Sequence, residues 1–167
     1  MKYTLDIPYP STHKLENDIH YGEMILSDLG GTYSKMNTIS LYFYNHIILE
    51  KQWPKLSYAM EKVCVVKILH LKILSKMCFQ LGVDPRLWEC QNDSLNYWSP
   101  NFNVYPQKID IMLENAILQE KKTINHYQQQ ISQIDNQIIT DMLQRIILDD
   151  ELHIKIFETF LQQYSTK

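Results

Sequence analysis

The chain contains four long stretches in which apolar side chains recur at the spacing of one helix face, and this pattern constrains its fold more than any other feature. The stretches cover about residues 32–51, 54–81, 106–131 and 135–164. The connections within the first pair and within the second pair are short, which makes the paired helices antiparallel neighbours. The connection between the pairs, residues 82–105, is an irregular segment long enough to run from one end of a bundle to the other. The sequence therefore predicts an all-α four-helix bundle with a long crossover between its second and third helices.

Two shorter segments precede the predicted bundle. Residues 1–14 contain two prolines and no helical period, so we expect an extended arm. Residues 15–31 have the pattern of a short helix that ends at two consecutive glycines. At 167 residues the chain has the length of one domain with a substantial core. We therefore predict a single domain over residues 1–167, with the bundle at about 32–164.

The composition argues against several partners and locations. The formal net charge is −3 and the basic residues are spread along the chain, so no nucleic-acid partner is expected. No apolar run approaches the roughly 18 residues needed to cross a bilayer, and the N-terminus lacks the apolar segment of a signal peptide. The three cysteines include no CxxC pair and favour a reducing compartment. We therefore predict a cytoplasmic protein with no membrane span.

Polar residues interrupt the apolar stripe of each long stretch. The interrupting residues are Lys35 in the first, Lys67 and His70 in the second, Glu120 in the third, and Asp150 and His153 in the fourth. When the helices pack together, we expect these side chains to meet in one buried layer. Two alternatives stay open. A shifted helix register would turn Lys67 toward solvent, and Lys35, close to the start of its helix, can extend its ammonium group outward.

The chain resembles the ferritin-like superfamily over about residues 17–164, most closely its small rubrerythrin-like bacterial members without a rubredoxin part. The resemblance is carried by "SKMNTISLYFYNH" (34–46), "EKVCVVKILHLKIL" (61–74), "LENAILQEKKTINHY" (113–127), "QRIILDDELHIKIF" (144–157) and the connection "LGVDPRLW" (81–88). It implies a ferritin-like bundle with a di-metal site built from one glutamate on each of two helices and a Glu-x-x-His motif on each of the other two.

Two of the four carboxylates that the resemblance implies are lysines in this sequence. The positions fall on Lys35, on Lys67 and His70, on Glu120, and on Asp150 and His153. The charges of two lysines and two carboxylates cancel before any metal binds, and buried charges that can pair need no metal. We therefore predict a degenerate di-iron site held together by a salt-bridge cluster, with no metal or other cofactor.

The leading interpretation is a non-catalytic, metal-free protein that acts through self-association or structural assembly. Residues 39–49 are apolar nearly all round their helix, which is more than one core face requires. Val65 and Leu69 add apolar surface on the outer side of the second long helix. These surplus positions predict a homodimer or a larger homo-oligomer.

A second interpretation makes the protein an enzyme. His70, Glu120, Asp150 and His153 would be ligands of a single iron or manganese ion, because histidine and carboxylate ligands suit these metals and leave coordination positions open. Lys67 would then be a charged group beside the metal or, with a lowered pKa, a proton donor. This interpretation predicts oxidase or peroxidase-like chemistry, and the sequence leaves the choice between the two open.

Overall fold

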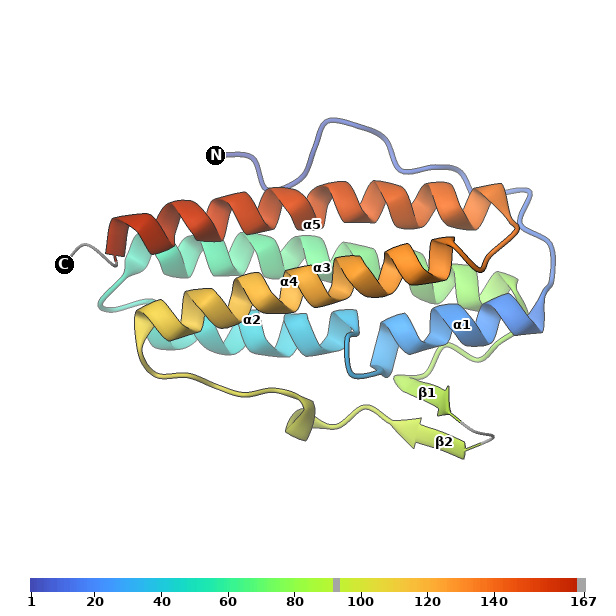
Figure 1. Cartoon of the computed structure of the whole chain (residues 1–167), viewed down its shortest axis with the longest axis horizontal. Coiled ribbons are helices and arrows are strands. Elements are labelled where there is room, and N and C mark those ends of the chain that lie inside the picture. The colour runs from blue at the N-terminus through green and yellow to red at the C-terminus, as the bar shows by residue number, and fades with distance from the viewer. Residues whose placement is uncertain (92–93, 165–167) are drawn as a thin grey trace.

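The computed structural model describes residues 1–91 and 94–164. Residues 92–93, inside the predicted crossover, and residues 165–167, at the end of the predicted domain, lie outside this description. The helices are α1 (Ile19–Gly30), α2 (Lys35–Leu49), α3 (Pro54–Gln80), α4 (Ile109–Ile131) and α5 (Gln137–Tyr164). Figure 1 shows α1 and α2 following one another along the same side of the bundle, so that together they occupy one helix position. The architecture is the predicted all-α bundle with a short N-terminal helix.

Local sequence signals account for where the helices begin and end. Asp18 caps α1 by accepting a hydrogen bond from the backbone N–H of Tyr21 at 3.0 Å. Pro54 occupies the first turn of α3, where its missing N–H costs nothing. Gly82 ends α3 with a φ of +91°, a conformation that a residue with a Cβ rarely adopts. The helix α4 begins at Ile109, three residues after the proline at which the sequence predicted its start.

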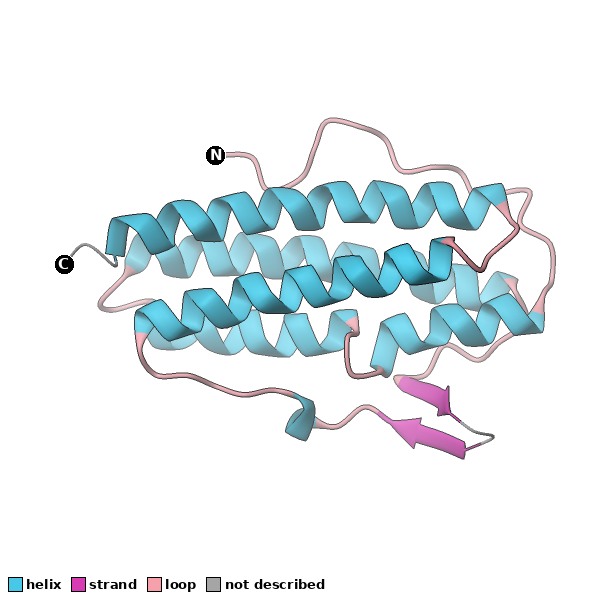
Figure 2. Ribbon diagram, in the orientation of Figure 1, coloured by secondary structure: helices cyan, strands magenta, loops and turns pink. Residues whose placement is uncertain are grey.

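The crossover contains regular structure that the sequence analysis described as irregular. Strand β1 (Trp88–Gln91) pairs antiparallel with β2 (Ser94–Tyr97), and a short 3₁₀ helix (Pro100–Phe102) follows. Figure 2 shows this hairpin as the strand element beside the bundle. The strand β1 packs on α1 so closely that a Cβ on Gly30 would lie 2.4 Å from the carbonyl carbon of Leu87. The prediction missed the hairpin because each strand is only four residues long.

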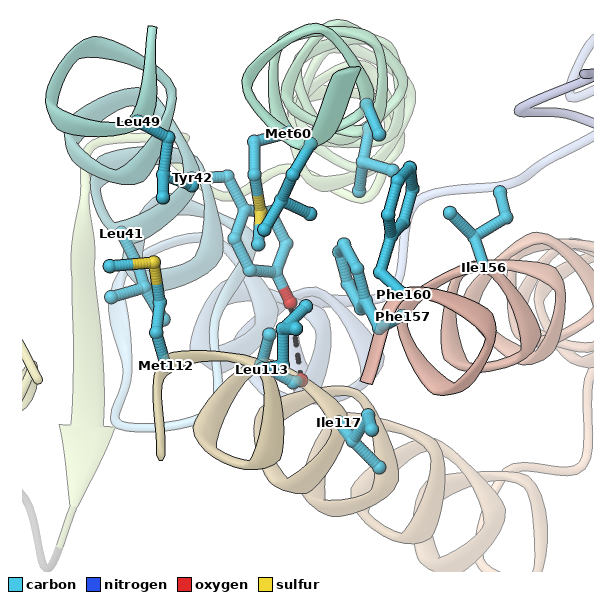
Figure 3. Close-up of a cluster of buried hydrophobic side chains, with 14 of the residues drawn as sticks. Leu41, Tyr42, Leu49, Met60, Met112, Leu113, Ile117, Ile156, Phe157 and Phe160 are labelled. Atoms are coloured by element: carbon cyan, nitrogen blue, oxygen red, sulfur yellow. Dashed lines mark hydrogen bonds between the residues drawn. The ribbon is translucent and has the colours of Figure 1, made fainter. Parts of the chain in front are cut away.

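Two apolar clusters fill the bundle on either side of the polar layer. One is built around Leu41, Tyr42, Leu56, Leu113 and Phe157, and Figure 3 shows it between α2, α3, α4 and α5. The other joins α1 to the opposite halves of α3 and α5, through residues such as Ile25, Leu74 and Ile146. On α3, α4 and α5 the polar interruptions lie between the residues of these two clusters, and Lys35 lies at the start of α2. The layer is thus enclosed by packed hydrocarbon at both ends. No helix of the described residues is long and apolar enough to cross a membrane.

The N-terminal arm, defined here as residues 1–14, is extended as predicted. Figure 1 shows its trace running beside α5 before the chain turns into α1. Its course is marked by hydrogen bonds from Thr4 and Leu5 to Asp149 and from Arg145 to the carbonyl of Ile7. The arm therefore covers the part of α5 that carries the polar layer.

Candidate metal centre

Two lysines and two carboxylates form the middle of the buried layer. The Nζ atom of Lys67, on α3, lies 2.5 Å from Glu120 Oε2 and 2.6 Å from Asp150 Oδ1. The Nζ atom of Lys35, in the first turn of α2, lies 2.7 Å from Asp150 Oδ2. All four side chains have 0% exposure. Neither of the solvent-facing alternatives for the lysines occurs, since both ammonium groups point inward.

The two histidines border the same carboxylates. His70 Nδ1 lies 3.7 Å from Asp150 Oδ1, and His153 Nδ1 lies 3.8 Å from both Asp150 Oδ1 and Glu120 Oε2. Each Nδ1 atom is buried and has no hydrogen-bond partner among the described residues. The fold therefore brings together all six residues that the sequence analysis selected. Their origin in a di-metal site remains a prediction.

The outer ring nitrogens determine how these histidines are protonated. His153 Nε2 lies 2.9 Å from the Tyr3 carbonyl oxygen, which can only accept a hydrogen bond. His70 Nε2 lies 3.1 Å from Asp149 Oδ2, and an ionised carboxylate likewise only accepts. Both rings therefore carry a hydrogen on Nε2. Burial lowers the pKa of His70 to about 4, so its Nδ1 presents a free electron pair to the carboxylates at neutral pH.

The charges of the layer stabilise one another. Burial disfavours ionisation of Asp150, but Lys35 and Lys67 outweigh it and hold its pKa well below the usual range. Burial disfavours ionisation of Glu120 too, and Lys67 again outweighs it, so the pKa of Glu120 is lowered. The pKa of Lys67 is raised, because Asp150 and Glu120 overcome its desolvation. Burial lowers the pKa of Lys35 to about 8 despite its contact with Asp150. At neutral pH the four groups are charged and their charges cancel.

Several residues around the layer were not selected from the sequence. Asp149 accepts hydrogen bonds from Tyr9 at 2.6 Å and from the Leu5 N–H at 2.9 Å, and it pairs with Arg145 at 2.9 Å. Burial opposes its ionisation, but the hydrogen bond from His70 and these further donors hold its pKa well below the usual range. Two consecutive aspartates in the sequence signalled polar chemistry there. Nothing in the sequence indicated that the arm would supply the partners.

Two buried tyrosines complete the surroundings of the layer. Tyr42 belongs to an apolar cluster, which Figure 3 shows. Its hydroxyl also donates a 2.5 Å hydrogen bond to Glu120 Oε1. The ring of Tyr127 lies under Lys35, with Nζ 4.8 Å from the ring centre. Aromatic faces thus cover the lysine side of the layer, where a cation is favourable.

Three of the layer residues have the arrangement of metal ligands. Glu120, Asp150 and His153 each offer one ligand atom, and these atoms lie within 4.8 Å of one another. The donor set of two carboxylates and one imidazole suits manganese or iron. The bare, buried Nδ1 atoms fit the same chemistry, because ligating histidines commonly donate their other ring N–H to a carboxylate or carbonyl oxygen. The residues present therefore fit one metal ion, which would compete with Lys67 for the carboxylate oxygens.

Comparisons with solved structures identify the class of fold. The manganese catalase KatB from Anabaena aligns with a TM-score of 0.85 and 14% identity, over 99% of this chain and 81% of that chain. A second KatB structure, from Anabaena PCC7120, gives the same values. A bacterioferritin from Rhodobacter capsulatus, with a metal-free dinuclear site and haem iron, aligns with a TM-score of 0.74 and 16% identity, over 91% and 89% of the two chains. The fold is therefore a ferritin-like four-helix bundle, as predicted.

Sequence-level comparisons add no family assignment. No family model matches the chain, and a search of curated proteins gave no match either. The likeness to KatB and to bacterioferritin establishes the shared fold, and the function has to be argued from this chain's own residues.

These findings overturn the leading functional interpretation of the sequence. Two of the solved structures with this fold are manganese catalases, and the described residues include a triad able to hold a metal. The prediction of a non-catalytic protein is therefore wrong, and the interpretation with a bound metal is better supported. The error has a physical reason. Charge balance alone does not decide metal binding, because lysines that neutralise the layer leave the ligand atoms of Glu120, Asp150 and His153 in place.

Proposed function

We propose that this protein is a metal-dependent redox enzyme of the oxidase or peroxidase class, with one manganese or iron ion held by Glu120, Asp150 and His153. The observation that carries the proposal is the convergence of three buried ligand atoms within 4.8 Å of one another. A bound ion of this kind supplies one-electron chemistry and polarises an oxygen-containing substrate. Apolar clusters on both sides of the layer keep bulk water away from it.

The histidine geometry supports ligation. A carbonyl oxygen holds the outer N–H of His153 and a carboxylate holds that of His70, at 2.9 and 3.1 Å. Such contacts fix the orientation of a ring and increase its basicity as a ligand. His70 Nδ1, 3.7 Å from Asp150, is placed to serve as a fourth ligand.

Lys67 has two roles in this proposal. Its ammonium group contacts oxygen atoms of Glu120 and Asp150 that an ion would bind, so metal binding requires Lys67 to move or to lose its proton. Metal affinity should therefore rise with pH. Because the pKa of Lys67 is raised, the residue keeps its proton at neutral pH and is a fixed positive charge beside the site rather than a proton donor.

Metal analysis of the purified protein tests the proposal. We expect about one manganese or iron ion per chain in protein prepared without chelators or a metal-binding tag, together with consumption of hydrogen peroxide or dioxygen. His153→Ala should lose both. The matched control is His126→Ala, because His126 pairs with Asp28 outside the layer, at 3.0 Å. A wild-type chain without metal after reconstitution with either ion would contradict the proposal.

We also propose that the six-residue layer derives from a di-metal site in which two carboxylates were replaced by Lys35 and Lys67. The resemblance to the rubrerythrin-like branch supports this origin, and membership of that branch remains a prediction, as does a cytoplasmic location. The double change Lys35→Glu with Lys67→Glu should raise the metal content toward two ions per chain. Unchanged metal content in a folded double variant would count against the proposed origin.

Self-association is the remaining part of the proposal. Phe43 and Ile47 on α2 are 60% and 51% exposed, and Val65 on the neighbouring α3 is 55% exposed. Exposed apolar residues grouped on one face mark interaction surfaces. In a two-fold symmetric dimer, the same face of each subunit packs against that of the other. Sedimentation at micromolar concentration should show a dimer or larger species that Ile47→Glu weakens. Leu118→Glu, at an exposed apolar position on α4, is the control.

A further inference from the structure

The N-terminal arm makes most of its hydrogen bonds to the bundle beside the proposed metal site, while Thr12 accepts a further one from Gln80 at 3.4 Å, near the end of α3. Hydrogen bonds between arm residues 3–9 and the bundle converge on four side chains of α3 and α5. These are His70, Arg145, Asp149 and His153. Two of the four are the histidines of the layer, and Asp149 is hydrogen-bonded to one of them. The arm thus contacts the site directly, at the outer nitrogen atoms of the two histidine rings.

The contacts to the histidines are specific. The carbonyl oxygen of Tyr3 accepts from His153 Nε2 at 2.9 Å. The hydroxyl of Tyr9 lies 3.0 Å from His70 Nε2 and donates to Asp149 Oδ2 at 2.6 Å. Each contact is satisfied by a hydrogen on Nε2, and in a neutral ring that hydrogen leaves Nδ1 bare on the side of the carboxylates.

Polar interactions hold the arm in place, together with the packing of Tyr3 and Tyr9 against the apolar clusters. Arg145 donates to the carbonyls of Ile7 at 2.8 Å and Leu5 at 3.0 Å, and its guanidinium lies 4.4 Å from the ring centre of Tyr9. The Leu5 N–H donates to Asp149 at 2.9 Å. Ile7 is exposed and contributes little buried surface. An extended segment held by a few charge-assisted hydrogen bonds can open without unfolding the bundle.

We propose that the N-terminal arm is a positioning element of the metal site: through the Tyr3 carbonyl and the Tyr9 hydroxyl it holds His153 and His70 with Nδ1 facing the carboxylates, and in its closed position it retains the bound ion. The retention of the ion rests on the proposed function. The hold on the histidines concerns the chain itself and can be measured without metal.

The variant Tyr9→Phe tests retention in the full chain, because it removes the hydroxyl and keeps the ring over Arg145. We expect manganese(II) to dissociate into excess chelator about 10-fold faster than from the wild type, the lower end of the range for losing such a supporting hydrogen bond. The matched control is Tyr44→Phe, which loses one hydrogen bond, from Gln107 at 2.8 Å, far from the layer. Wild-type dissociation from Tyr9→Phe would overturn the proposed retention.

Two measurements on the metal-free chain test the hold on the histidines. Nitrogen-15 NMR should show His70 and His153 with their hydrogen on Nε2, and a hydrogen on Nδ1 of either neutral ring would overturn the proposal. Hydrogen exchange should show protection of the Leu5 amide that decreases in Tyr9→Phe and is unchanged in Tyr44→Phe. An unprotected Leu5 amide in the wild type would also overturn it. If the wild type binds no metal, the proposed function fails, while these two measurements still decide whether the arm positions the histidines.

Discussion

Replacing Lys67 with methionine separates the electrostatic role of the layer from its packing. Methionine is close to lysine in length and apolar, so the main change is the loss of an ammonium group 2.5 and 2.6 Å from two fully buried carboxylates. Removing one partner of a buried ion pair costs about 3–5 kcal/mol, because the remaining charge stays buried without compensation. We therefore expect Lys67→Met to lower the free energy of unfolding of the metal-free protein by about 3–5 kcal/mol.

The same variant should bind metal more tightly than the wild type. Without Lys67, the charged members of the layer are Lys35, Glu120 and Asp150, so the layer is negative and the competing cation is gone. Manganese(II) at about 100 times its Kd should return about 2.7 kcal/mol of the lost stability. In the wild type, the same metal concentration should give a smaller gain, because the ion has to displace Lys67.

Urea unfolding followed by circular dichroism, with and without manganese(II), measures both effects. Lys72→Met is the matched control, since Lys72 is exposed on the same helix and the change should stay within about 0.5 kcal/mol. A Lys67→Met variant as stable as Lys72→Met without metal would refute the view that Lys67 neutralises the buried carboxylates. A folded Lys67→Met variant indifferent to manganese and iron would refute the competition between ammonium and metal.

Three further predictions concern the surroundings of the layer. The pKa of His70 is about 4 in the folded chain and 6.5 ordinarily, so as the pH falls the unfolded chain binds a proton at this ring before the folded chain does. The free energy of unfolding should therefore decrease by about 3 kcal/mol as the pH falls from 6.5 to 4. His70→Gln should flatten a plot of unfolding free energy against pH. Tyr42→Phe removes the 2.5 Å hydrogen bond to buried Glu120 and should lower the free energy of unfolding in urea by about 1.5–3 kcal/mol. An unchanged free energy of unfolding would show that the Tyr42 hydroxyl does not stabilise the Glu120 carboxylate. Gly82→Ala should cost at least about 1 kcal/mol, because φ is +91° and the new Cβ would approach the Asn17 amide; a melting temperature equal to that of the wild type would contradict it.

Helical periodicity was enough to predict the bundle because each helix has to bury one apolar face. The same counting located Lys67 inside the apolar stripe of its helix, where it is indeed fully buried. The prediction was less accurate for the crossover between α3 and α4, where helical spacing does not apply. The β1–β2 hairpin was missed although its strands alternate apolar and polar residues, because four-residue strands depend on packing against α1 for their stability. The close approach at Gly30 became visible only once Leu87 was placed beside it.

The sequence alone determined which residues could enter the polar layer, because the spacing of 3.6 residues per turn assigns each side chain to one helix face. Only the tertiary structure decided what those residues do to one another. Distances between atoms on different helices set the pairing of Lys67 with Glu120 and Asp150 and the free Nδ1 atoms of both histidines. The arm shows the difference most clearly. Tyr9 is 61 positions from His70, and the two meet because the folded bundle supplies Asp149 and Arg145 as partners for an otherwise featureless extended segment.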